Sequence, residues 1–217
     1  MRRAATGAGL LAILAAAQPT SAQLYQITPV SFDLSAGDTI GAKRSGSLCL
    51  PAGAVAWREA KPDTVDAREA VTQAARSAGL SVGAVDNPFE EGVTGFDRAI
   101  RVRVRGLHVT ACVPPGGMGR LMNRSHVIKG DGVIAIEWRV YVRGTDDPTI
   151  TRRTCTAFAY RGDPGALTDM TLLALRSATA KFAVSLAAGG SGPPVIEDDA
   201  CARLREKDGM SSQLSKD

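Results

Sequence analysis

The sequence predicts an α+β fold with the element order βαβββα, in which a mostly antiparallel sheet carries two helices on one face. Three observations support this prediction: long runs of alternating apolar and polar residues beyond Ala99, two runs with helical periodicity, and turn residues that separate these runs. The chain has 217 residues, 44% of them hydrophobic, which fits one domain with tails. We therefore expect one hydrophobic core.

The amino terminus has the composition of a secretory signal. Positive residues at 1–3 precede the apolar run 7–17, and small residues lead to a cleavage point after Ala22. The apolar run is too short to span a bilayer, which takes about 20 apolar residues. We expect a periplasmic or secreted protein with no membrane span once the signal is removed. The expected divisions are a signal peptide at 1–22, an extended arm at 23–45, an α+β domain at 46–188 and a flexible tail at 189–217.

The first half of the domain contains one well-marked helix. A buried strand is expected at 46–50, where Pro51 stops it. Asp63 is expected to cap a helix that ends at Gly79, and a strand at 80–85 follows. The apolar face of this helix is expected to hold Val65, Ala70, Val71, Ala74 and Ala78.

A long strand follows, and the phase of its alternation changes at Gly106. Before this glycine the apolar set is Ile100, Val102 and Val104, and beyond it the set is Leu107, Val109, Ala111 and Val113. A shift of one residue at a glycine predicts a β-bulge, with a turn between two shorter strands as the alternative.

A hairpin and a second helix end the domain. Residues 134–143 and 149–160 are predicted to pair antiparallel around a turn at 146–148. Asp163 is expected to cap the helix, with Pro164 in its first turn. Its buried side is expected to hold Leu172, Leu175, Ala178, Phe182 and Leu186.

The four cysteines all lie in the exported part, where an oxidising compartment favours disulfides. Four cysteines permit three pairings, and we favour Cys49 with Cys112 and Cys155 with Cys201, because the second pair would fix the tail. A zinc site is disfavoured because no two of the cysteines have zinc-ligand spacing.

No motif in the chain indicates catalysis. A base at His126 would have to act on the adjacent Ser125, and neighbouring residues rarely face each other productively. The glycine-rich loop from Pro114 leads into a strand, whereas phosphate-binding loops lead into a helix. The acidic pairs at 146–147 and 198–199 lack the spacing of a calcium loop. We therefore predict no catalytic residue, no metal site and no cofactor.

Basic residues form the sharpest candidate binding feature. The net charge of +4 includes two arginines of the signal, so the mature chain is only weakly basic and nucleic acid is not an expected partner. The alternation places the arginines on one sheet face, where they would attract an anionic partner. The alternative is a solvated outer face of an antiparallel sheet. The candidate binding residues are Arg101, Arg103, Arg105, Arg139 and Arg143, and Arg152 and Arg153 are expected on a neighbouring strand.

The last third of the chain carries a family resemblance. Its strand pair GVIAIEWRVYVRG and TITRRTCTAFAY, followed by LTDMTLLALRSATAKFAVSLAA, resembles the end of the auxiliary lipoproteins of envelope ABC transport systems. Related small folds occur in outer-membrane activators of peptidoglycan synthases and in the amino-terminal domain of the Tol translocation protein. The resemblance covers roughly 46–188, implies no site residue, and departs from the family by lacking a lipidated cysteine.

Together these features predict a non-enzymatic exported envelope protein. We expect an accessory or assembly factor that binds an envelope protein or an anionic envelope component. Two alternatives stay open: a small exported hydrolase that uses the loop at 116–126, and a structural subunit of a surface assembly. The sequence does not predict the oligomeric state.

Overall fold

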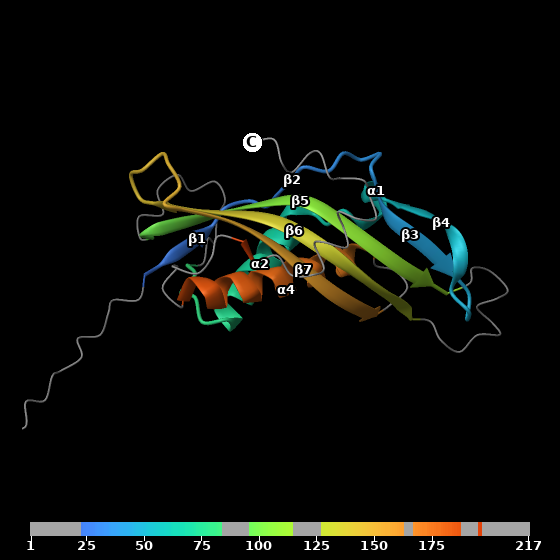
Figure 1. The fold of residues 1–217 in the computed structure, drawn as a ribbon. Helices are drawn as coiled ribbons and strands as arrows, with labels where there is room; N and C mark the ends of the chain where they lie inside the picture. The colour runs from blue at the N-terminus through green and yellow to red at the C-terminus, as the bar shows by residue number, and fades with distance from the viewer. Residues whose placement is uncertain (1–22, 84–95, 115–126, 163–166, 188–194, 197–217) are drawn as a thin grey trace, which may run out of the picture.

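A computed structural model describes residues 23–83, 96–114, 127–162 and 167–187, together with the backbone of 195–196. The strands are β1 (Tyr25–Ile27), β2 (Ser31–Phe32), β3 (Thr39–Ser45), β4 (Leu50–Ala56), β5 (Arg98–Val113), β6 (Ile128–Val142), β7 (Ile150–Gly162) and β8 (Val195–Ile196). The helices are α1 (Trp57–Ala60), α2 (Thr64–Ser77) and α4 (Leu167–Ala187). Figure 1 shows α2 and α4 together on one side of the sheet. This arrangement confirms the α+β class.

The described strands form one mixed sheet in the order β4-β3-β5-β6-β7-β8, with β1 and β2 also paired to β5. The pairs β3–β4, β5–β6 and β6–β7 are antiparallel. The strands β1, β2 and β3 instead run parallel to β5. Because β5, β6 and β7 are the longest strands, most of the ladder is antiparallel, as predicted.

The arm at 23–45 lies in the sheet. Its three strands follow one another along β5, with Tyr25 opposite Arg98 and Ser45 opposite Val113. The arm also contributes Tyr25, Ile27, Val30 and Ile40 to the hydrophobic core. The segment at 23–45 therefore shares its core with the segment at 46–188.

The strand expected at 46–50 is wrong, because residues 46–49 form the turn between β3 and β4 and Leu50 begins β4. Gly46 and Cys49 have φ values of 79° and 49°, in the left-handed region that a continuing strand does not use. Beyond the turn, β4 runs through Pro51 at the edge of the sheet, where a missing N–H is tolerated.

Helix α2 matches its predicted ends. The Asp63 carboxylate accepts the Val65 N–H at 2.7 Å, and Gly79 follows the helix with φ 90°. Val65 was wrongly assigned to the apolar face, since it is 69% exposed. Among residues 80–83, Val82 forms only an isolated bridge to Tyr25, so the described part of the strand predicted at 80–85 is not a full strand.

Strand β5 contains the predicted bulge. Its register with β6 shifts between Val104 and Gly106, and Gly106 then lies opposite Ala135. The apolar residues before and after the shift are buried on the same face, except for Val113 at the strand end, which is partly buried. The extra residue of the bulge thus keeps the apolar side chains of β5 directed toward the helices both before and after Gly106.

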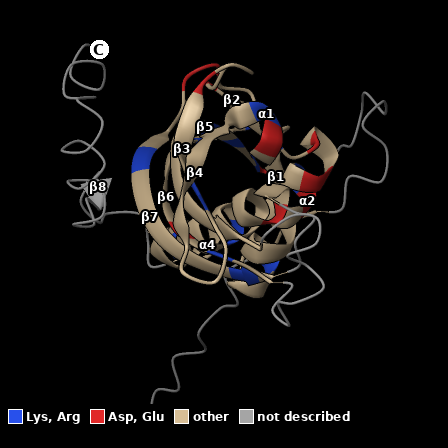
Figure 2. Ribbon diagram, turned by 90° about the vertical axis from the view of Figure 1, so that its right-hand side faces the viewer, with Lys and Arg blue, Asp and Glu red and all other residues tan. Residues whose placement is uncertain are grey.

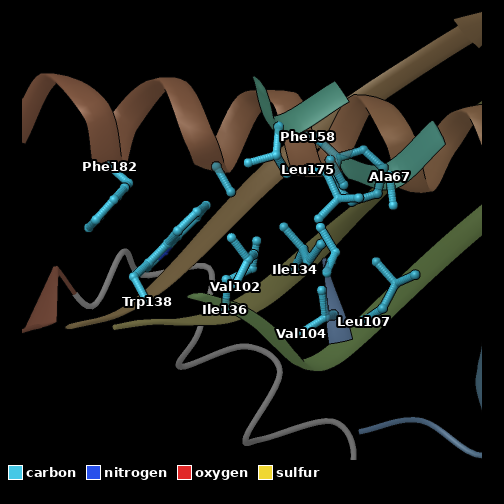
Figure 3. Packing of buried hydrophobic residues seen from close by; sticks show 14 of the residues in the cluster. Ala67, Val102, Val104, Leu107, Ile134, Ile136, Trp138, Phe158, Leu175 and Phe182 are labelled. Atoms are coloured by element: carbon cyan, nitrogen blue, oxygen red, sulfur yellow. The ribbon is translucent and has the colours of Figure 1, made fainter. Parts of the chain in front are cut away.

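The core is organised by β6 and α4. The rings of Trp138 and Phe182 stack with their centroids 4.4 Å apart, as Figure 3 shows. The Trp138 Nε1–H donates to Thr154 Oγ1 at 2.7 Å, so the buried indole is satisfied. Helix α4 is long and apolar enough to cross a membrane, and half of its most apolar stretch is buried in this fold. The predicted cap at Asp163 and Pro164 lies outside the described residues.

A disulfide joins Cys49 to Cys112, as predicted. It fastens the β3–β4 turn to the end of β5. Cys155 on β7 is also disulfide-bonded. Its predicted partner, Cys201, lies outside the described residues, so that pairing stays a prediction.

Candidate functional site

Four of the five candidate arginines lie on the outer face of the sheet, which we define as the face of β5, β6 and β7 that points away from the helices: Arg101, Arg103, Arg105 and Arg139. Arg101 lies opposite Arg139, and Arg103 lies opposite Glu137, which in turn lies opposite Arg153. Figure 2 shows the sheet curving around the helix layer, with basic residues in the ribbon near β6 and β7. The strand pairing therefore brings basic residues from three strands together.

The arm supplies a carboxylate to this face. Asp33, just beyond β2, accepts Arg103 Nε at 2.7 Å and contacts Arg105 Nε at 3.2 Å. The Asp33 backbone N–H donates to the Val104 carbonyl at 2.9 Å, which fixes the position of the carboxylate. Asp33 was not foreseen as part of this face, because its contacts join segments 70 residues apart in the chain and leave no local sequence pattern.

A second carboxylate, Glu137, is buried among the arginines. Its side chain is 1% exposed, with Arg139 Nη2 at 2.7 Å and Arg153 Nε at 3.3 Å from its two oxygens. Two ion pairs compensate the desolvation of this carboxylate. Alternation places Glu137 correctly on the outer face, but it does not show that the neighbouring side chains cover it.

Tyr141 contacts two guanidinium groups of this face, those of Arg101 and Arg139. Arg101 lies over the Tyr141 ring, 5.2 Å from its centroid, which is within the range of a cation–π contact. A side-chain hydrogen bond with Tyr141 and the charge of Glu137 raise the pKa of Arg139 above its ordinary value. Arg139 therefore keeps its charge at any physiological pH.

We call this set the outer arginine cluster. Five guanidinium groups face two carboxylates, so the cluster has a net charge of five minus two, or +3, supplied by Arg101, Arg103, Arg105, Arg139, Arg153, Asp33 and Glu137. Arg153 was not among the five predicted binding residues. Alternation does not continue through the turn at 143–149, so it could not decide which of Arg152 and Arg153 lies on this face.

Two other arginines lie apart from the cluster. Arg143 is exposed in the turn after β6, where its backbone N–H donates to the Asp97 carbonyl at 3.0 Å. Arg152 is buried on the opposite face, and its Nη1 donates to Ser185 Oγ on α4 at 2.7 Å. Arg152 and Arg153 are therefore neighbours in β7 that point to opposite faces: Arg152 contacts α4, and Arg153 contacts Glu137.

The described residues contain no group of three or more His, Cys, Asp or Glu side chains that could hold a metal ion. His108 lies on the outer face of β5 opposite Val133, three residues from the bulge. The predicted loop at 116–126, with Ser125 and His126, lies outside the described residues.

Comparisons with known proteins show no match to a protein-family model and none to a curated protein. One similar solved structure is that of an uncharacterized protein, which is 14% identical in sequence and has a TM-score of 0.35. The match covers 76% of this chain and 90% of that one. A Xanthomonas campestris protein with the DUF330 family model is 15% identical, with coverage of 78% and 85% and a TM-score of 0.40.

A minor lipoprotein from Acinetobacter baumannii is 12% identical, with coverage of 68% of this chain and 93% of that one and a TM-score of 0.32. Similarities of this size carry no argument about function.

Proposed function

We propose that this protein is a non-enzymatic exported envelope protein, an accessory or assembly factor that binds an anionic envelope component through its outer arginine cluster. One observation carries the proposal: the outer arginine cluster holds five guanidinium groups and two carboxylates on one sheet face, so its net charge is +3. The disulfide between Cys49 and Cys112 supports an exported protein, since such bonds persist in oxidising compartments.

The order of the cluster favours binding over a merely solvated surface. Arg103 and Arg105 are held by Asp33, Arg139 is held by Glu137, and Arg101 rests on Tyr141. A ligand that meets prearranged side chains loses less rotamer entropy on binding than one that must order them. Guanidinium groups also suit carboxylates and phosphates, because they can donate two parallel hydrogen bonds.

The test is capture from native envelope extract with a variant that removes charge and keeps the fold. In Arg101→Gln/Arg103→Gln, Asp33 keeps Arg105 and Glu137 keeps both of its partners. A charge-assisted hydrogen bond contributes about 1.5–3 kcal/mol, so we expect the specific partner to be captured at least roughly tenfold less.

The matched control is Arg58→Gln/Arg176→Gln, which removes the same charge from exposed positions on α1 and α4. We expect the control to capture the partner like the wild type. Equal capture by all three proteins would contradict the proposal.

A further inference from the structure

Four strands end together at one end of the sheet, which we call the hairpin end. Ser45 at the end of β3 lies opposite Val113 at the end of β5, and Ile128 at the start of β6 lies opposite Gly162 at the end of β7. Figure 1 shows the β3–β4 hairpin at the same end as the arrowhead of β5. The turn at 46–49 therefore extends beyond the paired strands.

A row of basic residues crosses the sheet one residue inside this end. Arg44 lies opposite Cys112, Cys112 opposite Lys129, and Lys129 opposite Arg161, so the four side chains share the outer face. The three basic side chains are exposed, and no described carboxylate forms an ion pair with them. We call Arg44, Lys129 and Arg161 the basic row.

The basic row differs from the outer arginine cluster in its neighbours. The basic row has a charge of +3. The nearest carboxylate on the outer face of β6 is that of Asp131, which is exposed and lies two residues from Lys129. On β7, Arg153 of the cluster and Arg161 of the basic row are eight residues apart, about 26 Å at the usual rise of a strand. The two sets are therefore separate surfaces, and the basic row is the one without internal partners.

Apolar side chains project beside the basic row. Residues 45–57 contain no charged side chain. Leu48 and Leu50 are 80% and 61% exposed, and residues 51–54 are exposed as well. The disulfide from Cys49 to Cys112 fastens this apolar tip, residues 48–54, to the basic row. Two large exposed leucines in an uncharged hairpin mark an interaction surface.

The hairpin end is poorly suited to pairing with another strand. Pro51 lacks an N–H in the edge strand β4, and the register of β3 with β4 shifts between Lys43 and Arg44. Prolines and bulges are features that prevent strand addition at sheet edges. A second copy of this chain or an extended peptide would therefore find an interrupted ladder.

We propose that the hairpin end docks on an anionic phospholipid surface. Leu48 and Leu50 enter the boundary between headgroups and acyl chains, while the basic row lies behind them at the level of the phosphates. The aliphatic stems of arginine and lysine allow their charges to stay in the headgroup layer. This inference uses other residues than the proposed function, so either can fail without the other.

The experiment is co-sedimentation of the oxidised full chain with vesicles. One set of vesicles is pure phosphatidylcholine, and the other contains equal parts of phosphatidylcholine and phosphatidylglycerol. Each basic residue near an anionic surface contributes roughly fivefold in partitioning, so we expect about a hundredfold stronger binding to the anionic vesicles. This preference should weaken strongly at high salt.

Three variants separate the contributions. Arg44→Gln/Lys129→Gln/Arg161→Gln should abolish the preference for anionic vesicles. Leu48→Ser/Leu50→Ser should weaken binding at least roughly tenfold, because it removes both apolar side chains. The matched control Val65→Ser/Val184→Ser changes two equally exposed apolar residues on α2 and α4 and should bind like the wild type.

Insertion is measured with Leu48→Trp, because Trp57 and Trp138 are buried and respond little to vesicles. A blue shift of the new tryptophan with anionic vesicles supports the proposal. Equal binding to both vesicles, no binding to either, or a loss in the valine control equal to that of the leucine variant would overturn it. Retention of a protein partner by the hairpin end without any vesicle binding would overturn it as well.

Discussion

The burial of Glu137 leads to a quantitative prediction for Glu137→Gln. Glutamine keeps the shape of the side chain, but its amide offers a single neutral acceptor to the two guanidinium groups that lie 2.7 and 3.3 Å from the carboxylate, because the amide NH2 can only donate. Replacing one charged contact with a neutral hydrogen bond costs about 1 kcal/mol, and losing the other contact costs about 1 kcal/mol more. Removing one partner of a fully buried pair costs about 3–5 kcal/mol, but Arg139 and Arg153 are partly exposed and regain water. We therefore expect a loss of about 2 kcal/mol.

Urea unfolding of the oxidised protein at 25 °C measures this loss. With a slope of about 2 kcal/mol/M, the midpoint should fall by about 1 M. The matched control is Glu59→Gln, because Glu59 is an exposed carboxylate paired with Lys43 at 3.5 Å. Such surface pairs contribute about 0–1 kcal/mol, so its midpoint should hardly change.

A double-mutant cycle tests whether the loss comes from the ion pair itself. We expect Glu137→Gln and Arg153→Gln to show a coupling of about 0.5–3 kcal/mol, since the two residues are in contact. Equal midpoints for Glu137→Gln and Glu59→Gln, or additive effects in the cycle, would refute the reasoning that the buried carboxylate holds the cluster together.

Three further predictions concern stability. Phe182→Ala removes a 1% exposed ring stacked on the core indole and should cost about 3–5 kcal/mol in chemical unfolding. Gly41→Ala should cost at least about 2 kcal/mol in the same measurement, because a Cβ there would overlap the Val109 carbonyl oxygen; a wild-type midpoint would contradict the pairing of β3 with β5. Cys49→Ser/Cys112→Ser opens a crosslink of sequence separation 63 and should cost up to about 4 kcal/mol, a value that thermal unfolding with and without reductant checks.

Local signals predicted the parts of the fold that local chemistry determines. Asp63 and Gly79 fix the ends of α2 through one side chain and one backbone angle, and Gly106 marks the bulge by a change of phase. The hairpin of β6 and β7 follows from alternation on both sides of a turn. In each case the determining atoms lie within a few residues of one another.

The parts that sequence reasoning missed depend on long-range contacts. The pairing of the arm with β5 has no local signature, and the short strands β1 and β2 are ordered by that pairing. The burial of Glu137 depends on side chains from neighbouring strands. The strand predicted at 46–50 failed because Cys49, a residue common in buried strands, occupies a turn that its disulfide holds. The candidate arginines of β5 and β6 lie on the outer face as expected, but Arg143 lies in the turn after β6, and the carboxylate partners were not foreseen.

The arm laid along β5 also constrains how the molecule forms. Its strands pair with residues about 70 positions later in the chain, and such non-local pairings are slow to close. A chain that emerges amino terminus first, from a ribosome or a translocation channel, presents the arm well before β5 is present. During that interval β3 can pair only with β4, β1 and β2 have no strand to pair with, and the apolar side chains of the arm stay exposed and prone to aggregation. We expect the docking of the arm to be the last and slowest step of refolding.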